Sequence, residues 1–238
     1  MTFLHGFLGD PSDGEFLRSD ASLNLVDWTP LIDSVPLDTR AKFLPTFAEL
    51  LYETIDSDNG VLMGYSLGGR IALHLLLIDS RMKKKKWRKA IIISASPGLQ
   101  TESERRLRYE SDQEWARKFR DEDWKTTVNE WLGQPLFFSN ELANEKLLKL
   151  KNKREFIAKL LVLCSISKQE DLRNDLPSLN LPILFVAGEM DRKYCELAKE
   201  CASLNTDYRY EIIANAGHRC AYTHKNEFLE ICNSFCQD

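Results

Sequence analysis

The chain has 238 residues, 43% of them hydrophobic and 29% charged, and a formal net charge of −4 at pH 7. This length is sufficient for one large α/β domain or two small ones around a real hydrophobic core. The weak negative charge gives no general electrostatic reason to bind nucleic acid, and the one basic run, Lys83 to Lys86, is typical of a solvated loop. No apolar stretch approaches the roughly 20 residues that span a bilayer, so we expect no membrane insertion.

The first residues and the cysteines indicate a reducing, cytoplasmic compartment. Residues 1–6 have no basic region followed by an apolar segment and do not resemble a signal peptide. The six cysteines include no C-x-x-C pair. Cys232 and Cys236 lie one helical turn apart, which could suggest a metal site, but no histidine pair or other ligand set accompanies them. We therefore expect free thiols, no metal and no cofactor.

Short apolar runs alternate with helical patterns toward both ends of the chain. Runs of this kind, followed by helices, predict a mostly parallel central sheet built of βαβ units and flanked by helices. The expected strands are Thr2–Leu4, Leu23–Val26, Gly60–Met63, Ala90–Ser94, Ile183–Ala187 and Tyr208–Ile213. The expected helices are Thr39–Ile55, Leu67–Asp79, Arg192–Ser203 and Thr223–Phe235.

The middle of the chain, from about residue 99 to residue 176, departs from this alternation. It follows the strand expected near residues 90–95, contains no convincing strand itself, and shows amphipathic helical patterns with an internal break at Pro135. We expect it to form a helical lid inserted into a single domain that spans residues 1–238. The lid helices are predicted at Glu102–Arg120, Trp124–Gly133, Glu141–Leu150 and Arg154–Ser165.

The motif G-x-S-x-G lies at the junction of a predicted strand and a predicted helix, within Val61 to Arg70. In that context the strand turns sharply into the helix, and the serine, here Ser66, is held in a strained conformation with its hydroxyl exposed. Gly64 and Gly68 lack the Cβ atoms that would clash where the turn crosses its neighbours. The motif predicts an enzyme if an imidazole and an acid complete it.

A serine of this kind needs an imidazole to take its proton, and in α/β-hydrolase folds the order is serine, acid, histidine. Three histidines follow Ser66. His74 lies on the apolar face of the helix after the serine and is interpreted as a packed or capping residue, and His224 is expected at the surface. His218 lies in a loop directly after the strand that ends at Ile213, where catalytic residues collect in open α/β sheets. His218 is therefore the predicted base.

The acid is expected on the loop after the preceding strand. That loop, Gly188 to Asp191, offers two carboxylates, Glu189 and Asp191. Chemistry leaves both open, and Asp191 is favoured because the spacing G-x-x-D is usual at this place in hydrolase folds.

An oxyanion hole is expected where the first strand ends. Residues 3–7 predict a strand followed by a glycine-containing turn, which can direct a backbone N–H at developing negative charge. The predicted donors are the N–H groups of Phe7 and of Leu67, the residue after the serine. His5 is interpreted as an organiser of this loop. Together these features predict an α/β-hydrolase fold with a serine–aspartate–histidine triad.

The chain resembles the 2-succinyl-6-hydroxy-2,4-cyclohexadiene-1-carboxylate synthase family, α/β-hydrolase-fold enzymes of menaquinone biosynthesis. The resemblance extends from Phe3 over nearly the whole chain. Arg70, which follows the sharp strand-to-helix turn around Ser66 (the nucleophile elbow), and the stretch from Pro97-Gly98-Leu99 to the arginines after it distinguish this family from ordinary esterases. It rests on Phe3–Gly9, Gly64–Arg70, Ser96–Leu99, Glu104–Arg108, Asp112, Trp115, Trp131, Gln134–Phe137, Gly188–Tyr194 and Ala216–His218.

The resemblance implies a lyase that removes a ring proton next to a carbonyl and releases pyruvate from an enolpyruvyl group. Because the family's substrate is a small molecule with three carboxylates, its pocket should be rich in arginines, whose planar fork matches a carboxylate. The implied substrate-binding residues are Tyr65, Arg70, Arg105, Arg108, Trp131, Lys193 and Tyr194. Relatives carry a further arginine late in the lid, a place for which Lys149, Lys151, Lys153 and Arg154 are open alternatives here.

Two other functions remain open from the sequence. A carboxylic-ester or thioester hydrolase would use the same triad through an acyl-serine. A non-catalytic receptor or scaffold of the same fold is a second alternative, although a binding module has no need of an elbow, an acid and a histidine together. No feature of the sequence predicts an oligomeric state.

Overall fold

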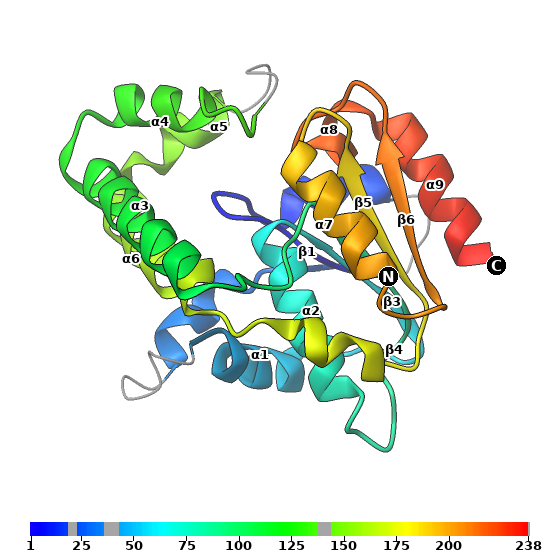
Figure 1. Cartoon of the computed structure of the whole chain (residues 1–238). Coiled ribbons are helices and arrows are strands. Elements are labelled where there is room, and N and C mark those ends of the chain that lie inside the picture. The colour runs from blue at the N-terminus through cyan, green and yellow to red at the C-terminus, as the bar shows by residue number, and fades with distance from the viewer. Residues whose placement is uncertain (19–22, 36–42, 138–143, 238) are drawn as a thin grey trace.

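The computed structural model describes residues 1–18, 23–35, 43–137 and 144–237. Within these residues the strands form one six-stranded sheet in the order β2-β1-β3-β4-β5-β6, with every neighbouring pair parallel (Figure 1). The chain runs from β1 to one edge and then crosses back to β3, so the order reverses between β1 and β3. Active sites of open α/β sheets form at such a reversal. The strands are β1 (Thr2–Leu4), β2 (Asn24–Val26), β3 (Gly60–Tyr65), β4 (Trp87–Ile93), β5 (Ile183–Gly188) and β6 (Tyr208–Ile213).

The fold prediction is confirmed, and the strands differ from their expected bounds mainly in β4. This strand begins three residues early because Trp87 pairs with Gly60 and Lys89 pairs with Val61. Polar side chains obscured this start in the sequence. Lys89 is nevertheless buried, since its ammonium donates to the carbonyl oxygen of Phe235 at 2.7 Å, near the end of the last helix. A cation is stabilised at that end by the unpaired helix carbonyls.

Alternate residues of each strand face two separate hydrophobic layers, as expected for a sheet covered on both sides. Leu4, Leu62 and Ile92 face a core shared with α1 (Phe43–Thr54), α2 (Leu67–Asp79) and α7 (Arg192–Ala202). Helix α9 (Lys225–Gln237) and the short helix α8 (Cys220–Thr223) pack on the opposite face of the sheet (Figure 1).

Two helix predictions changed at their ends. The start predicted at residue 39 lies outside the described residues, and α1 is described from Phe43 to Thr54, one residue short of the predicted end. The single helix expected from Thr223 to Phe235 is instead divided at His224 into α8 and α9. Two short 3-10 helices, Pro11–Leu17 and Thr29–Ser34, were not predicted, because segments this short show no helical period.

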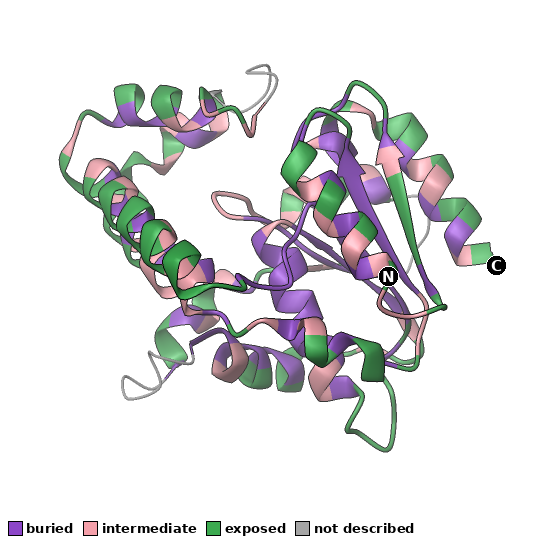
Figure 2. Cartoon of the chain, viewed as in Figure 1, coloured by how far each residue is buried: buried purple, intermediate pink, exposed green. Residues whose placement is uncertain are grey.

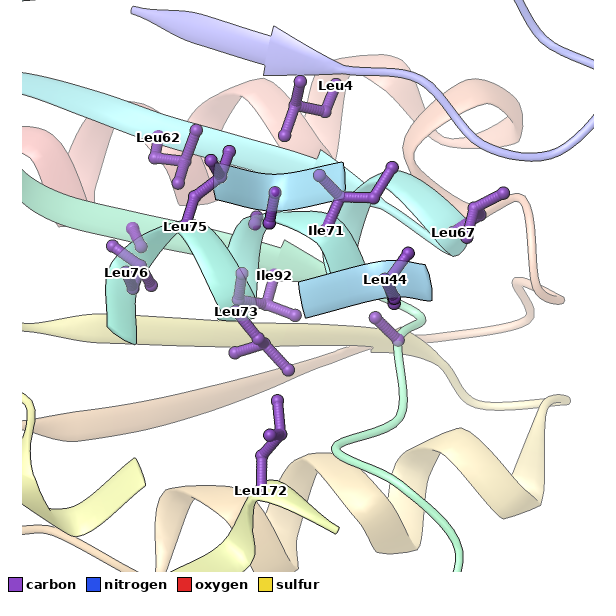
Figure 3. Packing of buried hydrophobic residues seen from close by; sticks show 14 of the residues in the cluster. Leu4, Leu44, Leu62, Leu67, Ile71, Leu73, Leu75, Leu76, Ile92 and Leu172 are labelled. Atoms are coloured by element: carbon purple, nitrogen blue, oxygen red, sulfur yellow. The ribbon is translucent and has the colours of Figure 1, made fainter. Parts of the chain in front are cut away.

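Helix α2 occupies the centre of the molecule and is buried along almost its whole length (Figure 2). Its apolar residues, among them Ile71 and Leu75, meet β-strand residues Leu4 and Leu62 (Figure 3). A helix that is apolar all round is stable only when it is covered on all sides. The position of the serine at its N-terminus is therefore held by the main core.

His74 shares this buried environment, which confirms its interpretation as a packed residue. Its side chain is 5% exposed, and burial, followed by the nearby Arg70 charge, lowers its pKa to about 3. Because an unfolded chain binds the proton at an ordinary pKa of 6.5, the unfolded state holds more protons between these two values. Stability should therefore decrease as the pH falls below 6.5 toward 3.

We expect His74→Leu to reduce this acid sensitivity. Between pH 7 and pH 5 the wild type should lose about 1–2 kcal/mol of unfolding free energy that the variant keeps. Urea denaturation at the two pH values measures the difference, with His224→Gln at the half-buried boundary of α8 and α9 as the matched control. An unchanged pH dependence in His74→Leu would contradict this account.

Between β4 and β5 the chain forms helices that stand to one side of the sheet in Figure 1. They are α3 (Glu102–Asp121), α4 (Trp124–Leu132), α5 (Asn144–Leu148) and α6 (Arg154–Leu163), followed by short 3-10 turns as far as Ser178. The helix start predicted at residue 141 lies outside the described residues. We call the segment from α3 to Ser178 the lid. Over the described chain, every helix is too short or too polar to cross a membrane.

The lid has its own core and is attached to the loop after β1. Thr101 begins α3 with a capping box, since its hydroxyl accepts from the Glu104 N–H at 3.1 Å and the Glu104 carboxylate accepts from the Thr101 N–H at 2.9 Å. The buried Phe119 ring lies 6.1 Å from the ring of Phe7, and Trp131 lies 5.4 Å from Phe7. The lid therefore reaches the loop expected to form the oxyanion hole.

Candidate active site

Ser66 lies between β3 and α2 in a strained backbone conformation. Its φ of 52° is in the left-handed region, which costs energy for any residue other than glycine. The turn is tight: a Cβ on Gly68 would lie 2.2 Å from the carbonyl oxygen of Leu4, and one on Gly64 would lie 2.4 Å from the carbonyl oxygen of Gly68. The Ser66 N–H still donates to Ile93 of β4 at 2.8 Å. The predicted strand–turn–helix elbow is therefore present.

A hydrogen-bonded relay joins three predicted residues from the carboxyl ends of three strands. The Oγ of Ser66 lies 3.1 Å from Nε2 of His218, and Nδ1 of His218 lies 2.7 Å from Oδ2 of Asp191. Ser66 follows β3, Asp191 follows β5 and His218 follows β6. His218 and Asp191 are 3% and 5% exposed, so the acid–imidazole bond is shielded from water.

The structure distinguishes the two carboxylates that the sequence left open. The carboxylate of Glu189 accepts the backbone N–H of Asn215 at 2.9 Å and does not reach the imidazole. It thereby holds the loop after β5 against the loop that carries His218. Asp191 is the acid in contact with the histidine.

Aromatic rings and a lid carbonyl surround His218. The ring of Tyr194 meets it edge-on with centroids 4.7 Å apart, and Tyr65 and Phe137 approach at 5.6 Å and 6.0 Å. The backbone N–H of His218 donates to the carbonyl oxygen of Leu136 in the lid at 3.3 Å. These contacts orient the imidazole, and the segment after α4 therefore forms part of the wall around the triad.

We call the cavity in front of Ser66 the catalytic pocket. Phe7 and Leu67, the two predicted oxyanion donors, both line it. Leu67 is the first residue of α2, and the first N–H groups of a helix have no partner within the helix and attract negative charge. The full lining is Phe7, Ser66, Leu67, Arg70, Arg108, Trp131, Leu161, Cys164, Ile166 and Tyr194.

His5 organises the loop that carries Phe7. Its ring stacks on Trp28 with centroids 4.6 Å apart, and its Nδ1 lies 3.0 Å from the carbonyl oxygen of Gly6. Burial lowers the pKa of His5, so the ring favours its neutral form. Gly6 permits close approach, since a Cβ there would lie 2.9 Å from the ring of Tyr65.

Arg70 is buried one helical turn after Ser66 and keeps one nitrogen without a partner. Its Nε donates to Oε1 of Gln169 and its Nη1 donates to the carbonyl oxygen of Cys164, each at 2.7 Å. Its buried Nη2 has no hydrogen-bond partner in the part of the chain that the structure describes. Burial lowers the pKa of Arg70 to about 10, which leaves the group charged at neutral pH. An oriented cation with a free donor in a pocket is suited to bind an anion.

Gln169 was not identified from the sequence. Its amide nitrogen donates to the carbonyl oxygen of Pro97 at 2.9 Å, which directs its oxygen toward Arg70. Gln169 is 1% exposed. Because it lies 99 residues from Arg70 along the chain, no local sequence pattern indicates that the two side chains are in contact. It is a positioning residue for the arginine.

Arg108 also lines the catalytic pocket, and the lid fixes its orientation. Its Nε donates to Oδ1 of Asp112 at 2.8 Å, and the hydroxyl of Ser165 donates to Oδ2 of the same carboxylate at 2.6 Å. Asp112 is 3% exposed. This buried carboxylate therefore anchors Arg108 one helical turn away.

The structure does not bring every predicted substrate-binding residue into the catalytic pocket. Arg105 donates to the carbonyl oxygens of Gln169 and Leu99 at 2.6 Å and 2.5 Å, so its guanidinium braces the lid. Lys193 is exposed, and partial desolvation followed by the nearby Arg108 charge lowers its pKa. Tyr65 lines a neighbouring cavity, and Trp131 lines both.

The four lid cations that the sequence left open also lie elsewhere. Arg154 donates to the carbonyl oxygens of Phe119 and Glu122 at 3.0 Å and 2.5 Å, and thereby caps the end of α3. Lys149, Lys151 and Lys153 are exposed. Among the described residues no group of three His, Cys, Asp or Glu side chains is placed to hold a metal ion.

The parallel sheet, the elbow and the serine–histidine–aspartate relay define a protein of the α/β-hydrolase class, and a family model described as "alpha/beta hydrolase fold" matches residues 16–224. A Haemophilus influenzae protein provisionally named 2-succinyl-6-hydroxy-2,4-cyclohexadiene-1-carboxylate synthase is 34% identical over 84% of each chain. A Citrobacter koseri protein with the same name is 30% identical over 100% of this chain and 92% of its own. The solved structure of MenH from S. aureus superposes with a TM-score of 0.75 and 25% identity, covering 99% of this chain and 92% of that one. The chain belongs to the 2-succinyl-6-hydroxy-2,4-cyclohexadiene-1-carboxylate synthase family.

Proposed function

We propose that this protein is a lyase that eliminates pyruvate from 2-succinyl-5-enolpyruvyl-6-hydroxy-3-cyclohexene-1-carboxylate. The product is 2-succinyl-6-hydroxy-2,4-cyclohexadiene-1-carboxylate, the compound after which the relatives are named. The observation that carries the proposal is the unpartnered Nη2 of buried Arg70 in the pocket that contains Ser66. A simple ester gives an enzyme no reason to bury such a cation, whereas a polycarboxylate does.

The charge of the pocket suits an anionic substrate. Arg70 and Arg108 both line the cavity, and each is held by neighbours that leave part of its guanidinium available. Arginine can bind a carboxylate through two parallel hydrogen bonds, which fixes orientation as well as charge. Fixed orientation matters here because the proton to be removed must lie next to the serine oxygen.

In the proposed reaction Ser66 acts as a base toward carbon. The hydroxyl proton passes to Nε2 of His218 while Oγ removes the ring proton next to the succinyl carbonyl, and the C–H electron pair moves onto that carbonyl oxygen. The N–H groups of Phe7 and Leu67 would stabilise the resulting enolate. When the enolate collapses, its carbonyl re-forms, a double bond forms at the deprotonated ring carbon, the ring double bond shifts toward the carbon that bears the enolpyruvyl oxygen, and the C–O bond at that carbon breaks. The protonated His218 then gives its proton to the leaving enolate, which becomes pyruvate, and Ser66 keeps the proton taken from the ring, so that the relay returns to its starting state.

Asp191 keeps His218 in the orientation and tautomer that this proton transfer needs. Its carboxylate accepts at Nδ1, so Nε2 is left to face Ser66. The carboxylate also stabilises the imidazolium that forms when the serine proton is transferred. No covalent bond between Ser66 and the substrate is required in this sequence of steps.

Assays with two classes of substrate test the proposal against the ester or thioester hydrolase that shares the triad. We expect purified protein to have a far higher kcat/KM for pyruvate release from the enolpyruvyl substrate than for hydrolysis of p-nitrophenyl esters. Brisk ester hydrolysis without pyruvate release would overturn the lyase proposal and favour an acyl-serine mechanism. Inactivity toward both classes would favour a binding protein.

We expect Arg70→Ala to lower kcat/KM for the enolpyruvyl substrate by roughly 10- to 100-fold, since a charge-assisted carboxylate contact contributes about 1.5–3 kcal/mol. Steady-state kinetics measure this loss, and thermal unfolding checks that the variant still folds. Arg106→Ala, on an exposed position of α3, is the matched control and should retain wild-type kinetics. An unchanged kcat/KM in folded Arg70→Ala would remove Arg70 from substrate binding.

A further inference from the structure

A second cavity lies beside the catalytic pocket, and we call it the side cavity. The two share Phe7 and Trp131 as common walls. Tyr65, which precedes Ser66 in β3, also lines the side cavity. The full lining is Gly6, Phe7, Leu8, Gly9, Asp13, Tyr65, Trp131, Leu132, Phe137, Lys146, Leu147, Arg219 and Tyr222.

Arg219 presents an uncompensated charge to the side cavity. Its guanidinium makes no hydrogen bond or ion pair with any residue that the structure describes, and its buried Nε lacks a partner. The guanidinium carbon lies 5.1 Å from the centre of the Tyr222 ring. Arg219 directly follows His218, so the loop that positions the catalytic imidazole positions this cation as well.

Two further charged residues, Asp13 and Lys146, line the side cavity and form an ion pair with each other. The ammonium of Lys146 lies 2.5 Å from a carboxylate oxygen of Asp13 and 2.9 Å from one of Asp10. A lysine held by two carboxylates has little remaining attraction for an added anion. Among the charged residues of the lining, Asp13 and Lys146 therefore cancel and Arg219 remains unpaired, while Asp10, outside the lining, adds one negative charge next to Lys146.

Tyr222 supplies a second unused donor. Its side chain is 9% exposed, and its buried hydroxyl has no hydrogen-bond partner among the residues described. Burial raises the pKa of Tyr222 well above the usual value, so the hydroxyl stays protonated. A buried hydroxyl without a partner costs free energy unless a ligand satisfies it. Arg219 and Tyr222 therefore place two unused donors in the lining of the side cavity.

We propose that Arg219 binds one carboxylate of the substrate, with the hydroxyl of Tyr222 as an additional donor. This inference rests on the proposed function, because it concerns a substrate with three carboxylates. Arg70 and Arg108 can receive two of them in the catalytic pocket. Arg154, a lid cation that could have received the third, is used to cap α3. Arg219 supplies a further cation in the side cavity, which shares Phe7 and Trp131 with the catalytic pocket.

Kinetics of Arg219→Gln, Arg219→Lys and Tyr222→Phe test this site. We expect Arg219→Gln to lower kcat/KM for the enolpyruvyl substrate by about 10- to 100-fold, mainly through KM, and Arg219→Lys to recover part of the loss. Tyr222→Phe should raise KM by about 5- to 10-fold. Arg106→Gln on the exposed face of α3 is the charge-matched control and should leave both constants unchanged.

Product inhibition identifies which carboxylate is bound. If Arg219 receives the enolpyruvyl carboxylate, the inhibition constant of pyruvate rises in Arg219→Gln. If it receives a carboxylate that stays on the ring, the inhibition constant of the cyclohexadiene product rises instead. Wild-type kinetics in Arg219→Gln, with both inhibition constants unchanged, would overturn the inference while leaving the lyase function intact. Absence of pyruvate release by the wild type would instead overturn the function itself.

Discussion

Ser66→Ala is expected to reduce kcat for pyruvate release by about 10²- to 10⁴-fold, the range that a positioned general base contributes. The substitution removes the oxygen that lies 3.1 Å from Nε2 of His218 and leaves the rest of the relay in place. Substrate binding should change little, because the arginine contacts remain. The loss should therefore appear in kcat and not in KM.

The control for this variant is Ser80→Ala, at the other end of α2. The hydroxyl of Ser80 is exposed and donates only to the carbonyl oxygen of Leu77. The Ser80→Ala variant should retain wild-type kcat and a wild-type melting temperature. Full activity in Ser66→Ala would show that the serine is not the base and would favour direct proton removal by His218.

Gly68→Ala is expected to destabilise the fold by about 3 kcal/mol or more, or to prevent folding. An added Cβ would lie 2.2 Å from the carbonyl oxygen of Leu4 and 2.5 Å from that of His5. Both obstacles are backbone atoms at the end of β1, and neither can move without separating β1 from α2. Urea unfolding, or the yield of folded protein if none is stable, measures the effect.

Gly133→Ala provides the matched glycine control. A Cβ there would meet the carbonyl oxygen of Asn129 at 3.2 Å, and the residue has an ordinary helical φ of −76°. We expect its unfolding free energy to lie within about 1 kcal/mol of the wild type. If Gly68→Ala were as stable as Gly133→Ala, the close crossing of β1 and α2 would be contradicted, and with it the position of the oxyanion loop beside Ser66.

The sequence identified the residues of the serine–histidine–aspartate relay because its signals there are local. An apolar run that ends in Gly64-Tyr65-Ser66 indicates both the strand and its turn, and each partner of Ser66 immediately follows a strand. Parallel strands bring such loops to one edge of the sheet. The choice between Asp191 and Glu189 needed the structure, because two residues of spacing do not determine which carboxylate faces the imidazole.

The lining of the pocket was harder to predict because it depends on contacts between distant segments. Arg105 and Arg108 lie three residues apart and share a helix face, yet one braces backbone carbonyls and the other lines the catalytic pocket. Arg105 is drawn away from the pocket by the backbone carbonyl of Gln169, and a periodic sequence pattern does not predict where that distant segment lies. Arg219 was not identified from the sequence for a related reason. The feature that singles it out, a buried Nε without a hydrogen-bond partner among the described residues, is visible only in the structure.

The contacts of Lys89 and of the lid cations could not be predicted from the sequence for the same reason. A lysine is rarely buried, so Lys89 alone argues against a buried strand at this position. Its burial is explained only by the structure, in which its ammonium donates to a backbone carbonyl near the end of α9. Arg154 likewise caps α3 from the start of α6, a contact set by how the two helices pack. Side-chain charge alone did not distinguish helix capping from substrate binding at these positions.

The most direct test of the account is to incubate purified protein with the enolpyruvyl substrate and to quantify pyruvate and the cyclohexadiene product together. Elimination predicts that the two appear at equal rates and in equal amounts, and that Ser66→Ala suppresses both in parallel. Formation of neither product by folded wild-type protein, or pyruvate without the diene, would contradict it.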